Sequence, residues 1–292
     1  MNELPVPVAA PSAHLGTLAP GVADPSLASP VMPVPPAHEN AYVVQGGVMY
    51  TAPSLRTCTM LRRSGGIVVS ANGKPFELHM KGEVTHHQAL VVKPLVEHRL
   101  LAEDTPIVSL LVNPLHPMFR MFRGMPRHGV MSLPREAFAY HEPQLQAASG
   151  GEFDGAQGGL LYNGLISTVA RYLPPVTHSA IDDKADHVVA LLHADVNRSL
   201  DELARSVGVS YTRMSHLFTQ SLGISLRNYQ LWLKIHNALN MLYSGTTLTE
   251  IARTNGFADL AHLSRVSRQA LGAPLTHFRS SASLKKIYCP AA

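Results

Sequence analysis

Two segments of the chain carry the same pattern: DELARSVGVSYTRMSHLFTQSLG at 201–223 and TEIARTNGFADLAHLSRVSRQALG at 249–272. Each has an apolar residue followed by alanine, a glycine four residues after that alanine, and a second amphipathic stretch that ends at another glycine. Glycine readily adopts a positive φ angle, so a short helix can end there and the chain can turn sharply. The pattern therefore predicts two pairs of helices with a tight corner in each pair, and it restricts this part of the chain to an α-helical fold.

Both copies also begin in the same way, with a hydroxyl residue followed three positions later by glutamate: Ser199-x-x-Glu202 and Thr247-x-x-Glu250. This spacing is a capping box. The hydroxyl accepts a hydrogen bond from a free amide of the first helical turn, and the glutamate accepts one from the amide of the cap residue. Two capped copies of a short helix, a glycine corner and a second helix predict two helix-turn-helix units, at about 199–221 and 247–271.

The segment between the two units has the pattern of one longer helix. Ser225 is a candidate N-cap and the pattern continues to Tyr243, so this helix would have roughly 18 residues and a length of about 27 Å. We interpret Trp232 as part of its core rather than as a platform for stacking on bases. In a helix-turn-helix unit the second helix, called the recognition helix, enters the major groove of DNA. Two recognition helices joined by a helix of this length can reach successive turns of the groove, which are about 34 Å apart, especially if the DNA bends.

The distribution of charge favours a polyanionic partner. From Arg198 to the C-terminus the chain has 11 Lys and Arg against 4 Asp and Glu, whereas the preceding residues have 13 against 16. A basic segment that contains both units is typical of a surface that binds double-stranded DNA. A helical bundle that binds another protein is the alternative interpretation, because helical corners are also common in protein cores.

Residues from about 180 to 283 resemble the AraC/XylS class of bacterial transcription regulators, in which two helix-turn-helix units are joined by a long helix. The matching residues are Leu203, Ala204, Gly208, Leu217, Phe218, Gly223, Tyr229, Ala238, Ile251, Ala252, Gly256, Phe257, Arg265, Gly272, Pro274 and Arg279. Lys234 stands where the class usually has arginine, and Ser267 stands where it usually has a buried aromatic residue. From Ser267 we expect the second recognition helix to be the less rigid of the two.

The resemblance also implies which side chains contact DNA. In each unit the second helix would lie in the major groove, with its apolar stripe buried. The implied base contacts are Thr212, Arg213, Ser215, His216, Ala261, His262 and Arg265. Alanine can offer only a methyl contact, so base reading by the second unit would rest on His262 and Arg265. Phosphate contacts, which set register without carrying sequence information, are expected for Arg227, Lys234, Arg253, Arg268 and Arg279.

The N-terminal part of the chain has a different pattern. Residues 1–38 are rich in proline and alanine with few charges, so we expect a disordered arm. From Ala41 to about Asn113, short β-type runs are separated by turn residues such as Asn72-Gly73, which predicts a small antiparallel barrel or sandwich. Helical stretches follow, with a flexible glycine break at 150–159. We therefore predict an α+β protein with an arm at 1–38, a β-barrel domain with helices at 39–176 and an all-α DNA-binding domain at 177–292.

The β-rich region resembles, more loosely, the cupin-like effector-binding and dimerisation domains of the same class. Pro94 and His98 have the Pro-x-x-x-His spacing seen in those domains. This resemblance implies a small-molecule effector and a homodimer, and an amphipathic helix at 159–173 offers a surface on which two copies can pair. RNA polymerase is a further expected partner. A role as activator is expected with it, although activation or repression depends on where the DNA site lies relative to the promoter.

A metal-dependent enzyme of cupin type, carrying a helical interaction domain, is the alternative function. Metal cupins use three or four ligands, usually from a His-x-His pair, a following glutamate and a later histidine. The chain has no His-x-His, and His86 and His87 are adjacent, so on a strand they point to opposite faces. We therefore expect no metal, no cofactor and no enzymatic activity.

The sequence also suggests where the protein works. No apolar run reaches the roughly 18 residues of a membrane span, and the N-terminal residues lack the basic start and apolar core of a secretory signal. Cys58 and Cys289 are far apart and have no metal-type spacing, which is typical of two reduced thiols. We expect a cytoplasmic protein with no membrane partner.

Overall fold

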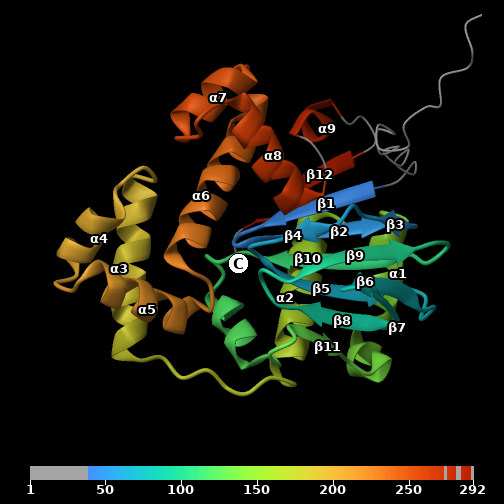
Figure 1. The fold of residues 1–292 in the computed structure, drawn as a ribbon. Coiled ribbons are helices and arrows are strands. Elements are labelled where there is room, and N and C mark those ends of the chain that lie inside the picture. The colour runs from blue at the N-terminus through green and yellow to red at the C-terminus, as the bar shows by residue number, and fades with distance from the viewer. Residues whose placement is uncertain (1–38, 273–274, 281–283, 291–292) are drawn as a thin grey trace, which may run out of the picture. The chain divides into compact units, whose positions relative to one another are not determined.

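The computed structural model of the chain describes residues 39–272, 275–280 and 284–290 (Figure 1). The arm predicted at 1–38 lies outside these residues. Strands predominate up to residue 112 and helices predominate after it, so the predicted α+β class is confirmed. Within the described ranges, no helix is long and apolar enough to cross a membrane.

The strands form two sheets. The larger sheet has the order β11-β8-β5-β10-β2-β1-β12, and the smaller has the order β3-β9-β6-β7, with β4 also paired to β9. Neighbouring strands are antiparallel except for β1 and β12. The strands are β1 (Glu39–Val44), β2 (Gly47–Ala52), β3 (Leu55–Arg56), β4 (Met60–Leu61), β5 (Gly65–Ser70), β6 (Phe76–Met80), β7 (Glu83–His87), β8 (Ala89–Val92), β9 (Glu97–Ala102), β10 (Ile107–Val112), β11 (Val130–Ser132) and β12 (Leu284–Tyr288).

The two sheets share no hydrogen-bonded ladder in the described part of the chain, so they form a sandwich, one of the two predicted alternatives, and not a closed barrel. Closure would require an end strand of the smaller sheet, β3 or β7, to pair with the larger sheet. However, β3 has two residues, and four of the five residues of β7 are exposed. A strand that is exposed on both faces has no apolar side to hold it against a second sheet.

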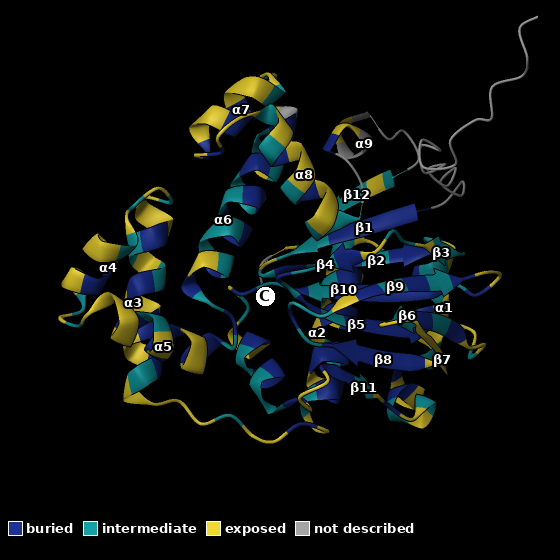
Figure 2. Cartoon of the chain, in the orientation of Figure 1, coloured by how far each residue is buried: buried dark blue, intermediate teal, exposed yellow. Residues whose placement is uncertain are grey.

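Side chains of the larger sheet alternate between two apolar clusters, because successive residues of a strand point to opposite faces. One face, which is buried beneath helices, carries Tyr42 and Met49 (Figure 2). The other face meets the smaller sheet. We call the residues packed there the inter-sheet cluster: Met60, Val68, Phe76, Leu78, Leu90, Val92, Leu100, Ala102, Ile107 and Val130.

The helices follow the sheets in the chain. They are η2 (Pro117–Gly124), η3 (Arg135–His141), α1 (Glu142–Gly150), α2 (Gly155–Ala170), α3 (Ala180–Ala194), α4 (Leu200–Ser206), α5 (Tyr211–Leu222), α6 (Leu226–Asn240), η4 (Met241–Tyr243), α7 (Leu248–Thr254), α8 (Leu260–Leu271) and α9 (Leu275–Ser280).

The flexible break predicted at 150–159 is wrong for most of its length. Asp154 and Gln157 form a capping box, so α2 already begins at Gly155. Gly158 is buried, and a side chain there would overlap the ring of Tyr42, which means that the glycine allows the helix to approach β1 closely. Only residues 151–154 separate α1 from α2.

The C-terminal strand β12 is an element that the sequence patterns did not predict. It lies parallel to β1, with Leu284 opposite Glu39 and Tyr288 opposite Val43, and forms one edge of the larger sheet. The amide of Cys289 extends the ladder by donating to the carbonyl of Val43 at 2.9 Å. A segment within the predicted DNA-binding region is therefore attached by backbone hydrogen bonds to the first strand of the β-rich region.

We predict that Ile287→Pro destabilises the protein. Proline removes a backbone donor from the ladder with β1, and the side chain of Ile287 packs against the helix-covered cluster. The free energy of unfolding, measured with urea, should fall by about 1–3 kcal/mol. Lys285→Ala, at an exposed position of the same strand, is the control and should change stability little. Equal effects of the two substitutions would show that β12 does not hold the sheet edge.

Candidate nucleic-acid interface

The first helix-turn-helix unit consists of α4 and α5. The amide of Ser199 donates to the Glu202 carboxylate at 2.9 Å, and the amide of Glu202 donates to the Ser199 hydroxyl at 3.3 Å, so the predicted capping box is confirmed. Hydrogen bonds from the cap lower the pKa of the Glu202 carboxyl. The recognition helix α5 begins at Ser210, whose hydroxyl accepts from the amide of Arg213. It ends at Gly223, which has a φ of 74°.

The second unit, α7 and α8, repeats this construction. The amide of Thr247 donates to the Glu250 carboxylate at 3.0 Å, and the amide of Glu250 donates to the Thr247 hydroxyl at 3.3 Å. Asp259 caps α8 by accepting from the amide of His262 at 2.6 Å. The helix ends at Gly272 with a φ of 77°. The two copies in the sequence therefore have the same local structure.

The helix that joins the two units is shorter than predicted. Ser225 caps α6 as expected, by accepting from the amide of Asn228, but the α-helix ends at Asn240 and continues as the 3-10 turn η4. Its 15 residues have a length of about 22 Å rather than the predicted 27 Å. Trp232 is buried as predicted, and its ring stacks on His236 with centroids 5.2 Å apart.

The corner glycines have the positive φ angles that the pattern predicts, 67° at Gly208 and 66° at Gly256. Their surroundings differ. A Cβ atom on Gly208 would meet nothing within 4 Å, whereas one on Gly256 would overlap the side-chain amide of Asn197 and lie 2.8 Å from Nζ of Lys234. The second corner is therefore packed against α6 and the loop after α3, and the first is open.

In α5, the predicted base-contacting side chains lie on the outer side of the helix. Thr212, Arg213 and His216 are exposed and Ser215 is half-buried. Figure 2 shows the opposite side of α5 as buried. The buried stripe is Met214, Leu217, Phe218, Ser221 and Leu222. The sequence pattern thus identifies correctly which side of the recognition helix is free.

In α8, Ala261 and Arg265 are exposed and His262 is half-buried. The ring of His262 lies edge-on to Phe257, with centroids 5.5 Å apart, and its Nδ1 accepts from the amide of Ala258 at 3.4 Å. With Nδ1 as acceptor, the neutral imidazole carries its proton on Nε2 and can donate outward. The ring is therefore fixed to the corner of its own unit.

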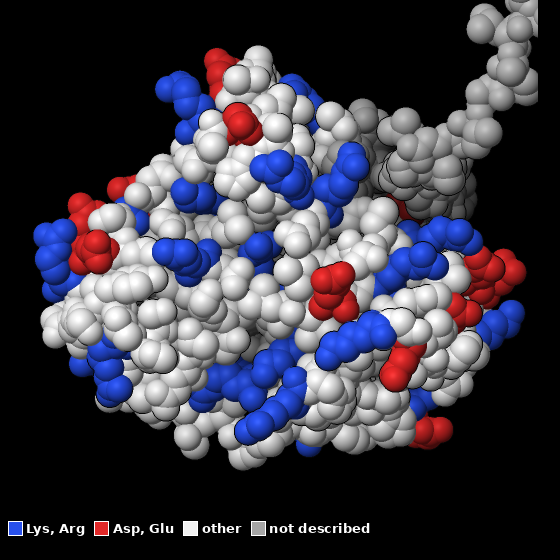
Figure 3. Space-filling model, in the orientation of Figure 1, with Lys and Arg blue, Asp and Glu red and all other residues white. Residues whose placement is uncertain are grey.

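The residues predicted to contact phosphates fall into two groups. Arg227, Arg253, Arg268 and Arg279 are exposed, and their guanidinium groups form no salt bridge within the described residues. Lys and Arg side chains lie over this part of the molecule in Figure 3. Lys234 differs, because its Nζ donates to the carbonyl of Gly256 at 3.1 Å. Burial lowers the pKa of its ammonium group.

Ser267 occupies the core of the second unit. Its side chain is fully buried, and its hydroxyl has no hydrogen-bond partner within the described residues. A buried hydroxyl without a partner is unfavourable, and a serine fills less space than an aromatic ring. The packing of α8 is consistent with the lower rigidity that we expect for this helix, which stays a prediction.

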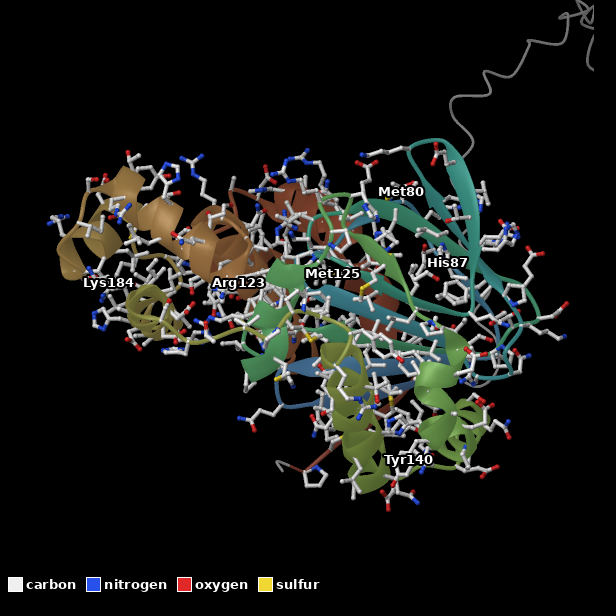
Figure 4. The ribbon with its side chains drawn as sticks, turned by 90° about the horizontal axis from the view of Figure 1, so that it is seen from below. Met80, His87, Arg123, Met125, Tyr140 and Lys184 are labelled. Atoms are coloured by element: carbon white, nitrogen blue, oxygen red, sulfur yellow. The ribbon has the colours of Figure 1, made fainter. Side chains whose placement is uncertain are left out.

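A buried ionic cluster, which the sequence patterns did not reveal, contacts the end of α5. The carboxylate of Asp182 in α3 is fully buried and accepts from the hydroxyls of Ser221 at 2.6 Å and Ser179 at 2.8 Å. Nε of Arg120 and Nη1 of Arg123, both from η2, lie 3.1 and 3.2 Å from it. In Figure 4, Arg123 lies on the side of η2 that faces these helices. The sequence identifies Asp182 only as an acidic residue at a helix start.

The ionic cluster determines the protonation of Asp182. Burial alone would raise the pKa of this carboxyl, but hydrogen bonds from Ser221 and Ser179 and the charge of Arg120 outweigh it and lower the pKa to about 2. The folded state therefore favours the ionised form more strongly than the unfolded state does. The ionised carboxylate therefore contributes to the free energy of unfolding. This stabilisation is present above the ordinary pKa of 3.8 and is lost as the pH falls towards 2.

The described residues show no convergence of three or more His, Cys, Asp or Glu side chains that could hold a metal ion. His86 lies 3.8 Å from Glu77, whereas His87 faces the hydroxyls of Thr85 and Ser132. The two adjacent histidines thus have different partners.

We predict that alanine is less well tolerated at Gly256 than at Gly208. A left-handed backbone costs a non-glycine residue about 1–2 kcal/mol, and this applies to both positions. At Gly256 the new methyl group must also displace Asn197 and the Lys234 ammonium, which adds about 1–3 kcal/mol. Urea unfolding of Gly208→Ala and Gly256→Ala measures the difference. Equal losses would contradict the tighter packing of the second corner.

We predict that Asp182→Asn lowers the free energy of unfolding by about 2–3 kcal/mol at neutral pH. The variant should also lose less stability than the wild type between about pH 4 and pH 2, because the titrating carboxyl is gone. Asp183→Asn, which changes a neighbouring carboxylate with 70% side-chain exposure, is the matched control. If Asp183→Asn has the same effect as Asp182→Asn, the buried cluster is not the cause.

Comparison with known proteins agrees with this geometry. Residues 203–281 match the helix-turn-helix domain family. An uncharacterised HTH-type transcriptional regulator of Staphylococcus aureus is 34% identical over 108 residues, which cover 35% of this chain and 14% of that protein. The arabinose operon regulatory protein of Salmonella typhimurium is 30% identical over 159 residues, which cover 50% of this chain and 56% of that protein. The chain thus covers less than two thirds of the length of either relative.

Among solved structures, ToxT of Vibrio cholerae aligns with a TM-score of 0.50 over 83% of this chain and 96% of ToxT. The sequence identity is 14%, so this similarity shows the fold alone. It extends over most of the described residues, including the β-rich region. Residues 203–281 therefore form a helix-turn-helix domain of AraC type, as the repeated pattern and its capping boxes predict.

Proposed function

We propose that the protein is a transcription regulator that binds a specific double-stranded DNA site with α5 and α8. The observation that carries this proposal is the duplicated unit. In both units the first helix begins at a capping box, a glycine at positive φ forms the corner, and the recognition helix leaves polar side chains free on its outer side. The excess of Lys and Arg from Arg198 onward, 11 against 4 Asp and Glu, favours a polyanionic partner over a protein.

The proposed roles follow from the chemistry of each side chain. The guanidinium group of Arg265 can donate two parallel hydrogen bonds to a guanine edge, and Nε2 of His262 can donate to a base acceptor. In the first unit, Thr212, Arg213, Ser215 and His216 face the bases. Ala261 offers a methyl contact.

Phosphate contacts are assigned to the cations around these helices. The four exposed arginines have no competing salt bridge within the described residues and can neutralise phosphates directly: Arg227, Arg253, Arg268 and Arg279. Lys234 already donates to Gly256 and has two further N–H groups for a phosphate. These contacts would fix the register of both units on the DNA.

We predict that His216→Ala and Arg265→Ala relax base preference in different halves of the DNA site. Each should cost about 1–3 kcal/mol of binding free energy if the lost contact is direct. Arg227→Ala should instead weaken binding to all sequences alike, because a phosphate contact carries no sequence information. Selection of bound sequences from a random library by each variant measures both effects. If His216→Ala and Arg265→Ala relax the same base pairs, two separate reading helices are excluded.

We further propose that the β-rich region binds a small-molecule effector and forms a homodimer, that RNA polymerase is a partner, and that the protein acts in the cytoplasm. ToxT, with a similar fold, has been crystallised with a naphthalenyl butenoic acid. Support for the dimer comes from α2, which has no charged residue and exposes Leu160 to 75%. An uncharged helix face with an exposed leucine is suited to pairing with a second copy.

We predict that Leu160→Arg converts a dimer into a monomer. The full-length protein should sediment as a dimer at micromolar concentration, and a charge on the paired face would have to be buried without a partner. Val84→Arg, on the exposed strand β7, is the control and should leave the dimer intact. A wild-type chain that stays monomeric at tens of micromolar, both free and on DNA, would rule out the dimer.

A further inference from the structure

Polar contacts along one side of α6 join the two helix-turn-helix units (Figure 1). Gln230 of α6 donates from Nε2 to the carbonyls of Val196 at 2.8 Å and Arg198 at 3.2 Å. Both carbonyls lie in the loop between α3 and α4, which leads into the first unit. Lys234, one helical turn further along α6, donates to the carbonyl of Gly256 at 3.1 Å, in the corner of the second unit. One side of α6 therefore holds a segment of each unit.

The loop between α3 and α4 also reaches the corner of the second unit directly. A Cβ atom on Gly256 would lie 2.1 Å from Oδ1 of Asn197 and 2.8 Å from Nζ of Lys234, so both side chains lie against this glycine. Burial lowers the pKa of the Lys234 ammonium group, and the charge of Asp195, in the same loop, opposes this shift. We call Asn197, Gln230, Lys234 and Gly256 the inter-unit brace.

The apolar cores of the two units do not supply this connection. Among the described residues, the apolar cluster of the first unit includes Trp232 and Leu233 of α6, and a separate cluster combines Ile235 and Ala238 with the second unit. Close packing is not a general feature of the corner either, because a Cβ atom on Gly208 would meet nothing within 4 Å. The brace therefore links the two units outside their cores.

The angle between the two units determines which spacing of DNA sequences they can read. Helix α6 is about 22 Å long, so a tilt of about 10° of one unit against the other moves its recognition helix by about 4 Å. Successive base pairs are about 3.4 Å apart along the duplex, so this small tilt corresponds to about one base pair. A tilt of that size would pull Lys234 away from the carbonyl of Gly256, or Gln230 away from the loop. The brace therefore opposes the motion that a different spacing would require.

We propose that the inter-unit brace sets the spacing between the two DNA segments that α5 and α8 read, with Gln230 and Lys234 as positioning residues. The inference rests on the proposed DNA-binding function and adds a determinant of site specificity that lies outside the recognition helices. Gln230 holds the first unit to α6, and Lys234 holds the second. Loss of either contact frees one unit to tilt, so the protein then accepts sites whose two segments are one base pair closer together or farther apart.

The test uses the full-length protein and a DNA site selected from a random library, together with the same site lengthened or shortened by one base pair between the two segments. Fluorescence anisotropy measures the affinity for each duplex, and the spacing ratio is the affinity for the selected site divided by that for an altered site. We expect a wild-type ratio of at least about ten, and a ratio of about three or less for Gln230→Met and for Lys234→Met. Lys184→Met, which removes the charge of an exposed lysine in α3, is the control and should keep the wild-type ratio.

The spacing ratio separates a positioning role from other roles of the same residues. If Lys234 acted only through a phosphate, Lys234→Met would weaken binding to all spacings alike and leave the ratio unchanged. A loss of stability would lower the folded fraction equally for every duplex. An unchanged ratio in Gln230→Met or in Lys234→Met, the same reduction in Lys184→Met, or a wild type that binds all spacings equally would each overturn the proposal.

The preference of the wild type for the selected site over random DNA tests the proposed function separately. If this preference is present and the spacing ratio does not respond to Gln230→Met and Lys234→Met, only the proposal for the brace fails. If the wild type shows no such preference, the proposed function fails and the proposal for the brace fails with it.

Discussion

The direction in which each recognition helix points depends on one backbone constraint, a glycine at positive φ between the two helices of each unit. The positive φ angles of Gly208 and Gly256 turn the chain sharply after α4 and α7. Helices α5 and α8 therefore start at a sharp angle, and each packs its apolar side into a buried cluster. The capping boxes fix where the preceding helices begin, and the Gly223 and Gly272 caps fix where the recognition helices end. With both ends determined, only the outer side chains are free to meet a ligand.

The same construction is supported differently in the two units. The first unit is held by the ionic cluster of Asp182, whose carboxylate joins η2, α3 and the end of α5. The second is held by the hydrogen bond from Lys234 to Gly256 and by the packing of α8 against β4, while the buried hydroxyl of Ser267 has no hydrogen-bond partner among the described residues. Both units contact the rest of the chain: the first shares the helix-covered cluster with the larger sheet, and the second packs α8 against β4. Under the proposed function, an effector bound in the β-rich region acts on DNA reading through these contacts.

The features that could be predicted from the sequence are those with a local cause. The capping boxes, the glycine corners, the buried stripe of α5 and the strand-rich N-terminal region each depend on residues close together in the chain. The length of α6 was overestimated because the turn η4 continues its apolar pattern beyond Asn240. The pairing of β12 with β1 and the contact of Arg120 with Asp182 join distant segments. They could not be predicted, because LKKIY has no distinctive strand period and a buried ion pair has no sequence signature.

The central claim, that the exposed outer faces of both units bind a DNA duplex, is tested most directly by the salt dependence of DNA affinity. The measurement is fluorescence anisotropy with the full-length protein and a DNA site selected from a random library, over a series of salt concentrations. If the four exposed arginines each neutralise one phosphate, the slope of log K against log salt should be about −3.6 or steeper, and random DNA should bind far more weakly. An affinity that does not depend on salt, or that is the same for random DNA, would contradict this claim.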